Sequence, residues 1–173
     1  QLQESKIDED TIDNVINRIE EEQSNHKFWT KNDKGTIKIV HILFKHFLEE
    51  NGFYKFNPEG SKNYVFVRVT NNLIDHTSEK EIKDFILDYL QEMDDLAIYN
   101  YFAENTRYFR EEFLTLLSSI DVYFIEDTSD TSYLYFNNCA VQVQQGRVRS
   151  IDYVDLDGYV WKDQVIDRAY KDC

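Results

Sequence analysis

The chain has 173 residues and is 42% hydrophobic and 15% aromatic, which supplies enough apolar area for one packed domain or at most two small lobes. Its 33 acidic side chains outnumber its 19 lysines and arginines, and the resulting net charge of −14 disfavours autonomous DNA binding, which depends on neutralising phosphates. Two cysteines make no disulfide framework, and no apolar run approaches the ~20 residues that cross a bilayer.

Helical periodicity dominates the first third of the chain. Apolar residues at helical spacing predict an amphipathic helix over residues 7–22, followed by a connection over residues 24–35. The spacing of apolar residues from Ile37 to Leu48 predicts a second helix. We expect that helix to end at Asn51 and Gly52, because glycine readily adopts the left-handed conformation of a helix C-terminus.

Alternating apolar residues then predict strands. Residues 53–56 and 64–70 flank a turn rich in polar residues, which is typical of a β-hairpin. Asn71 and Asn72 are expected to turn the chain into a short strand at residues 73–74.

The next segment returns to helical spacing. Ser78 and Glu81 form a capping-box pattern ahead of a regular apolar series that extends to Met93. Two further helices are predicted over residues 96–104 and 106–120.

The last part of the chain reads as an antiparallel meander. Its turns are predicted at Asn137 with Asn138 and at Gln145 with Gly146. The expected strands span residues 122–125, 133–136, 140–144 and 148–151. Helices and strands are segregated rather than alternating, so the sequence predicts an α+β fold, with a hairpin near residues 53–70 and a meander near residues 122–151.

The stretch around Gly158 is rich in aspartate, so it can be compared with the pattern of a calcium-binding loop. With Gly158 at the sixth position of such a loop, Asp155 and Asp157 fall on ligand positions, but Tyr153 and Gln164 occupy two positions that need strong oxygen ligands. Turn formation is therefore the preferred interpretation, with the two aspartates accepting backbone hydrogen bonds.

No residue is assigned a catalytic, cofactor-binding or metal-binding role. Gly60, Ser61 and Lys62 lie in a hairpin turn rather than in a phosphate-binding loop, and adjacent carboxylates are expected on solvated surfaces. Tyr133 and Tyr135 on a strand could stack on nucleobases, but core packing is the preferred interpretation.

A resemblance to a known family rests on the C-terminal part of the chain. Its matching segments are residues 135–138, 141–143, 147–153, 157–161 and 164–170. They resemble the region that precedes the ATPase module in superfamily 3 (poxvirus-like) primase-helicases of phages, plasmids and integrated elements, and a looser match extends the similarity back to about residue 53. Where the family tends to have glycine after asparagine, this chain has Cys139, so we expect Asn138 to take the left-handed position.

The resemblance implies that residues 1–173 form a single accessory domain of a longer protein, with possible lobes at 1–120 and 121–173. The domain would be non-catalytic, and ATP and magnesium would bind downstream. Its expected partners are the ATPase domain and, in the full-length protein, further copies of itself, with weak or no DNA binding, no membrane contact and a cytoplasmic location.

Aromatic residues close to the predicted ATPase are the interface candidates, namely Trp161, Tyr159 and Tyr153. The residues expected to act structurally, in turns, are Asn137, Asn138, Asp157 and Gly158. Two alternatives stay open: a stand-alone acidic interaction protein of a mobile element, including a DNA mimic, and an enzyme whose site is assembled from scattered carboxylates.

Overall fold

The computed structural model describes residues 27–93 and 95–171. The chain divides into two compact units, residues 1–47 and residues 48–173. The helix expected over residues 7–22 lies outside the described residues.

The first unit contains a short antiparallel hairpin of β1 (Trp29–Lys31) and β2 (Ile37–Ile39). The predicted connection over residues 24–35 and the predicted start of a helix at Ile37 are therefore wrong. Asn32 explains the difference: its side-chain oxygen accepts the amides of residues 34 and 36 at 3.0 and 2.8 Å and closes a turn. Two isoleucines separated by one residue then fit a strand as well as they fit a helix.

Helix α2 (His41–Glu50) follows and ends where the sequence predicted. In the first unit, the ring of Phe28 lies 5.0 Å from that of Phe44 and 4.8 Å from that of Phe47, so the helix packs on the residue that precedes β1. Gly52, beyond the helix end, has φ +86° and provides the expected left-handed cap.

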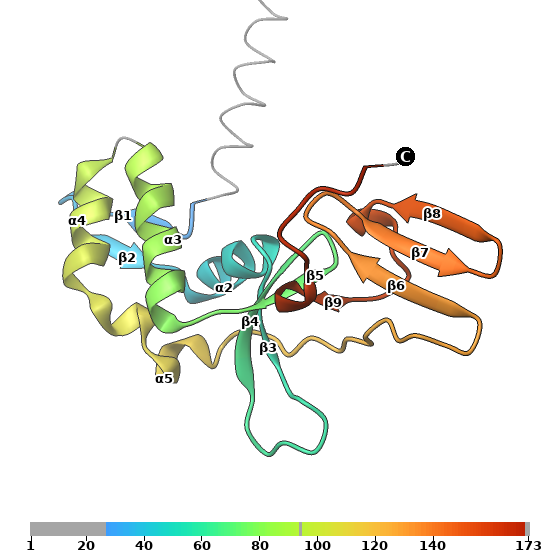
Figure 1. Cartoon of the computed structure of the whole chain (residues 1–173). Coiled ribbons are helices and arrows are strands. Elements are labelled where there is room, and N and C mark those ends of the chain that lie inside the picture. Colours follow the sequence, from blue (N-terminus) through green and yellow to red (C-terminus); the bar gives the residue numbers. More distant parts are fainter. Residues whose placement is uncertain (1–26, 94, 172–173) are drawn as a thin grey trace, which may run out of the picture. The chain divides into compact units, whose positions relative to one another are not determined.

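A four-stranded sheet organises the second unit (Figure 1). Its order is β3 (Phe53–Phe56), β4 (Val65–Thr70), β5 (Leu73–His76) and β9 (Val160–Trp161). The hairpin of β3 and β4 and the turn into β5 confirm the prediction, and Asn71 and Asn72 have φ values of +50° and +61°, as a tight hairpin turn requires. The parallel pairing of β9 with β5 was not expected.

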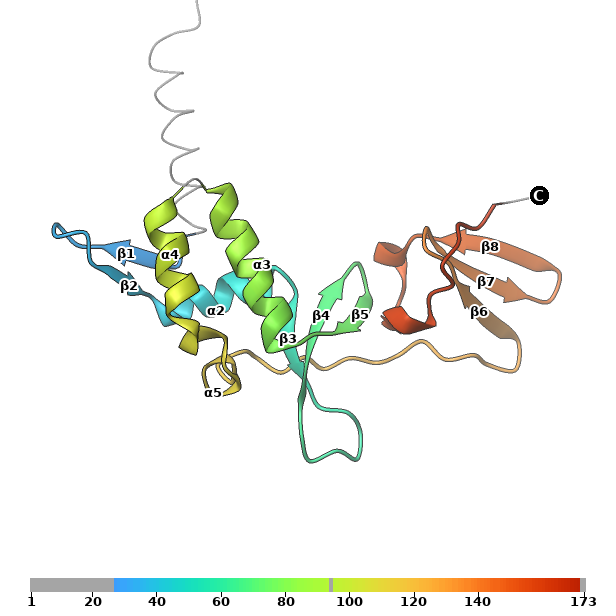
Figure 2. The same ribbon diagram turned by 60° about the vertical axis from the view of Figure 1, so that its left-hand side comes forward.

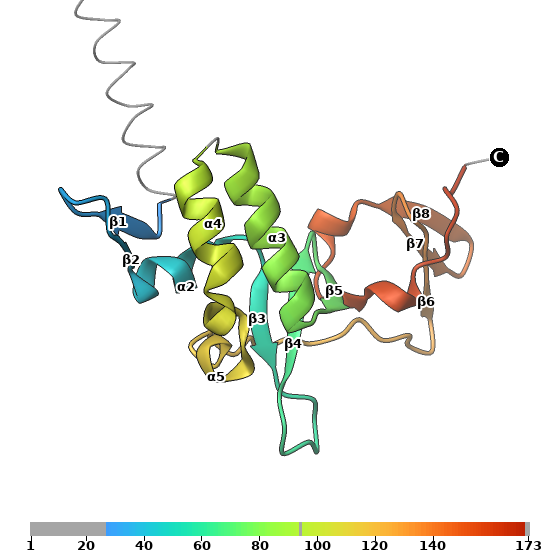
Figure 3. The ribbon, with the colours of Figure 1, turned by 90° about the vertical axis from the view of Figure 1, so that its left-hand side faces the viewer.

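Helices α3 (Glu79–Glu92) and α4 (Leu96–Glu104) lie side by side, as Figure 3 shows. Both agree with the predicted helices. The Ser78 hydroxyl accepts the Glu81 amide at 3.3 Å, and the Glu81 carboxylate accepts the Ser78 amide at 2.8 Å, so the capping box is confirmed.

The helix predicted over residues 106–120 is wrong in length. A 3₁₀ turn (Thr106–Phe109) and the single-turn α5 (Glu111–Leu114) replace it, and Arg110 between them has an extended backbone. The chain then pairs with the outer edge of β3. The Lys55 amide donates to the Ser118 carbonyl at 2.9 Å, and the Ile120 amide donates to the Lys55 carbonyl at 2.8 Å. This edge pairing takes residues 118–120 out of any helix.

A three-stranded antiparallel meander completes the second unit and confirms the prediction (Figure 2). It comprises β6 (Thr131–Tyr135), β7 (Ala140–Gln144) and β8 (Arg147–Ile151). The strand expected at residues 122–125 forms no ladder. Instead it makes a single bridge, in which the Ile125 amide donates to Tyr159 and the Tyr159 amide donates to Tyr123, both at 3.0 Å.

The turn between β6 and β7 lies where it was expected but has a different backbone. The Phe136 amide donates to the Cys139 carbonyl at 2.9 Å and closes the turn. Asn138 is not left-handed, because Asn71 and Asn72 are the only non-glycine residues with positive φ in the described part of the chain. The Asn138 side chain instead forms hydrogen bonds with the backbone of Tyr170.

We predict that Gly52→Ala is far more damaging than Gly60→Ala. Both glycines have positive φ, +86° and +74°, so both substitutions introduce similar backbone strain of about 1 kcal/mol. A Cβ atom at Gly52 would lie 2.1 Å from the Val69 carbonyl oxygen, whereas at Gly60 nothing lies within 4 Å. Urea unfolding should show a loss of at least about 3 kcal/mol for Gly52→Ala. Equal losses for the two variants would contradict the predicted steric conflict.

Candidate functional site

The structure brings some of the predicted residues together and separates others. Asn137, Asn138 and Tyr153 line the same open cleft, whose volume is about 540 Å³. Asp157 lines a different cavity of about 300 Å³, and Trp161 belongs to an aromatic cluster on the four-stranded sheet.

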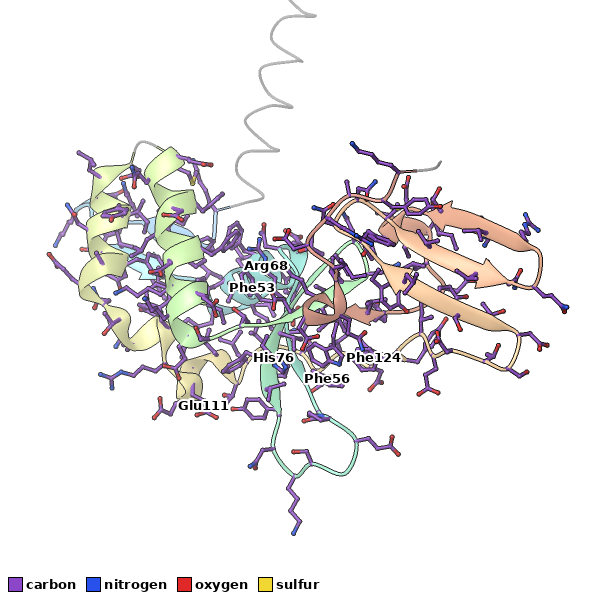
Figure 4. The ribbon with its side chains drawn as sticks, in the orientation of Figure 1. Phe53, Phe56, Arg68, His76, Glu111 and Phe124 are labelled. Atoms are coloured by element: carbon purple, nitrogen blue, oxygen red, sulfur yellow. The ribbon has the colours of Figure 1, made fainter. Side chains whose placement is uncertain are left out.

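Trp161 is surrounded by three other rings. Its ring stacks on His76 at 4.5 Å with an angle of 15° between the planes, and on Phe124 at 5.2 Å with an angle of 18°. Phe56 meets it edge-on at 5.8 Å, and Figure 4 labels these three neighbours. The parallel register that places Trp161 opposite Ile74 positions the indole in this group. We call these four rings the aromatic stack; the interface role of Trp161 stays a prediction.

Tyr159 and Gly158 lie where the chain crosses residues 123–125. Tyr159 is half-buried and exchanges backbone hydrogen bonds with that segment. A Cβ atom at Gly158 would lie 2.9 Å from the Tyr123 ring and 3.0 Å from the Ile125 side chain. Glycine is therefore needed at this bend because another segment approaches closely, and not because of a left-handed backbone.

Tyr153 is buried, and its hydroxyl donates to the Phe136 carbonyl. Burial, followed by the neighbouring Cys139 and Tyr135, raises the pKa of Tyr153 to about 12. Its ring thus joins the residues that follow β8 to the turn between β6 and β7. In this fold its contacts are internal, and its predicted interface role is untested.

The aspartate-rich turn is held differently from the sequence prediction. The Asn72 side-chain amide donates to the carbonyls of Tyr153 and Leu156, each at 3.0 Å. A backbone bond of 2.9 Å from Asp155 to Asp152 completes the 3₁₀ turn Tyr153–Asp155. The expected hydrogen bonds to the carboxylates of Asp155 and Asp157 are not seen among the described residues.

Four charged residues line the cleft that were not among the predicted site residues, namely Arg68, Asp75, Asp152 and Lys162. The Arg68 guanidinium lies 4.8 Å from the Phe53 ring and 4.6 Å from the Phe85 ring, and its Nε donates to the Asn51 carbonyl at 3.2 Å (Figure 4). These contacts fix the orientation of the guanidinium, and Arg68 is one of the residues that line the cleft.

Asp75 on β5 and Lys162, which follows β9, form an ion pair. Lys162 Nζ lies 2.7 Å from an Asp75 carboxylate oxygen, and both side chains are exposed. Asp152 lines the cleft as well, so two cations, counting Arg68, are balanced by two anions. The charged side chains that line the cleft therefore cancel in formal charge.

A partial signal for this group was present in the sequence. A two-residue turn at Asn71 and Asn72, extended beyond the predicted strand end at residue 74, would place Arg68 opposite Asp75, and the structure has that pairing. Lys162 could not be found in this way, because it reaches Asp75 only through the parallel pairing of β9 with β5.

Within the residues that the structure describes, no group of three or more histidine, cysteine or carboxylate side chains is arranged to hold a metal ion. Over the same residues, no helix is both long enough and apolar enough to cross a membrane. Comparisons of the chain with protein-family models, curated proteins and solved structures found no match.

We predict that Asn72→Gly destabilises the second unit while Asn71→Gly does not. Glycine tolerates the positive φ at both positions, so backbone strain is not introduced by either change. Only Asn72 contributes two side-chain hydrogen bonds, and their loss should cost about 1–3 kcal/mol in urea unfolding. A similar effect of the two substitutions would show that the Asn72 amide is not important for stability.

The raised pKa of Tyr153 leads us to predict a loss of stability at alkaline pH. Its folded-state pKa of about 12 lies above the unfolded value of about 10, so the contribution of Tyr153 to stability is fully present below pH 10 and is lost between pH 10 and 12, as the unfolded state releases the proton first. Burial likewise raises the pKa of Tyr135 to about 12, so Tyr153→Phe should reduce the slope without abolishing it. Urea midpoints measured from pH 8 to 11.5 test this; an unchanged slope would exclude a contribution from Tyr153.

Proposed function

We propose that this chain is a non-catalytic accessory domain of a replicative primase-helicase, and that it positions an ATPase motor that follows it in the polypeptide. The family resemblance suggests the biological setting. The structural observation that supports the positioning role is the segment of residues 165–170, which we call the docked segment.

Backbone hydrogen bonds join the docked segment to the end of β6 and the turn that follows. The Ile166 amide donates to the Tyr135 carbonyl at 2.8 Å, and the Asn137 amide donates to the Arg168 carbonyl at 3.1 Å. The segment therefore runs parallel to the end of β6, with a bridge between Phe136 and Ile166.

Side chains hold the far end of the docked segment. The Asn138 side chain accepts the Tyr170 amide at 2.7 Å and donates to the Tyr170 carbonyl at 3.2 Å, so it pairs with the backbone as a neighbouring strand would. The Tyr170 ring lies 5.3 Å from the Phe136 ring. The Arg168 guanidinium lies over the same Phe136 ring, 5.5 Å from its centre.

These contacts give the docked segment a fixed direction on the meander. A domain joined to it would be held in a restricted orientation, whereas a flexible linker would let it sample many. A rigid exit of this kind suits a domain that orients a motor. We assign the binding of ATP and magnesium to that motor and no catalytic residue to this chain.

We predict that Asn138→Ala loosens the docked segment and that Asn137→Ala does not. The Asn138 side chain makes both bonds to Tyr170, whereas the described bond of Asn137 uses its backbone amide, which alanine keeps. Asn138→Ala should lower stability by about 1 kcal/mol and accelerate hydrogen exchange at Tyr170. Unchanged exchange in Asn138→Ala would show that this side chain does not hold the segment.

The same pair of variants tests the proposed function in the natural polypeptide. Its coding sequence beyond residue 173 should contain a strand followed by G-x-x-x-x-G-K-[ST]. In that protein, Asn138→Ala should impair motor assembly and ATP hydrolysis more than Asn137→Ala. A coding sequence that stops at about residue 173 would refute the proposal and favour the stand-alone acidic protein.

A further inference from the structure

We propose that the outer edge of β8 binds an extended peptide in which acidic and apolar residues alternate, adding it to the meander as a fourth strand. This inference goes beyond the proposed function and does not depend on it, because it concerns a separate surface of the second unit.

The edge is open along its whole length. β8 (Arg147–Ile151) lies at one end of the sheet order β6-β7-β8 and pairs only with β7. Its first four residues are exposed and the last is partly buried. In an antiparallel pair, alternate residues direct their N–H and C=O groups away from the partner strand. No described hydrogen bond reaches those outward groups of β8, so they are available to pair with another strand.

The opposite edge of the meander is different. The Asp127 carboxylate accepts the backbone amide of Tyr133 on β6 at 2.9 Å, and the Thr128 amide donates to the Thr131 carbonyl at 2.8 Å. These contacts block part of β6, so β8 is the better edge for strand addition.

One face of β8 is basic. The register places Arg147 opposite Gln144 and Arg149 opposite Gln142, so the two arginines are on the same face of the sheet. Both are exposed, and residues 140–151 contain no acidic side chain. Carboxylates at alternate positions of an added strand are complementary to these two arginines. Arg149 also lines the cavity of about 300 Å³ that contains Glu126, Asp155 and Asp157, whereas Arg147 does not line it.

The other face of β8 is apolar. Val148 is 57% exposed and lies opposite Val143, which is partly buried. Leu134 on β6 is on the same face and is 48% exposed. Apolar residues between the carboxylates of an added strand would extend this surface and cover Val148.

A second copy of the chain fits this edge poorly. Antiparallel pairing of β8 with its own copy over its full length places Arg149 directly opposite the other Arg149, and like charges in directly opposed positions are destabilising. The two arginines thus disfavour self-pairing and favour an acidic partner. Charge complementarity is the observation that selects the occupant.

The test uses the whole chain and four synthetic peptides. The probe is acetyl-Thr-Val-Glu-Val-Glu-Val-Thr-amide, and the first control replaces both glutamates by lysine. The second control carries N-methyl groups on alternate residues and is made in two versions, one methylated at the odd-numbered positions and one at the even-numbered positions. Only one version lacks the N–H groups that face β8. Amide chemical shifts of isotopically labelled protein report both the site and the affinity.

We expect the acidic probe to shift the amides of residues 147–151 and to bind at least about fivefold more tightly than the lysine peptide. One of the two N-methylated versions should not bind. The double variant Arg147→Glu with Arg149→Glu should reverse the preference. The matched variant Lys62→Glu with Lys80→Glu, which changes net charge equally at exposed sites outside β8, should retain it.

Four results would overturn the inference. They are equal affinity for the acidic and lysine peptides, shifts confined to residues outside β8, full binding by both N-methylated peptides, and a dimer of the unmodified chain that pairs through β8. Thermal unfolding of both double variants confirms that they are folded, so a loss of binding in the arginine variant cannot be attributed to unfolding.

Discussion

A ladder of two residues, between β5 and β9, joins the hairpin part of the second unit to its meander part. Asn72 supports it with three bonds: its carbonyl accepts the Val160 amide at 3.0 Å, and its side chain donates to the carbonyls of Tyr153 and Leu156. Backbone groups removed from water need such partners. The aromatic stack and the lysine–aspartate pair at the cleft both require this ladder, because β9 brings Trp161 and Lys162 to β5.

Features whose chemistry is local could be predicted from the sequence. The capping box at Ser78, the glycine that ends α2 and the tight turn at Asn71 and Asn72 each depend on a few adjacent residues, and the structure contains all of them. The missed hairpin of β1 and β2 is a local error, because Asn32 closes its turn through the amides of residues 34 and 36. The other errors occur where a distant partner decides. Residues 118–120 pair with the edge of β3 and leave the predicted helix, and Asn138 binds Tyr170 while its own backbone keeps a negative φ.

The candidate site shows the same division. The sequence predicted that the aspartate-rich turn is held by hydrogen bonds to Asp155 and Asp157, whereas the amide that holds the turn belongs to Asn72, more than eighty residues earlier in the chain. Lys162 could be found only after the parallel pairing was known. A net charge of −14 was equally uninformative about individual surfaces, because the cleft is balanced and β8 is locally basic.

Asn72 and Asn138 have the same role at the two ends of residues 153–170. Each side-chain amide binds backbone groups of that stretch, Asn72 from the four-stranded sheet and Asn138 from the meander. Between these two points, Tyr153 and Trp161 pack inward against the meander turn and β5. The two sheets therefore cannot separate without breaking the contacts at one of the two asparagines. A stretch rich in aspartate and aromatic residues, which resembles an active site in composition, therefore acts here as a connection between the two sheets of the second unit.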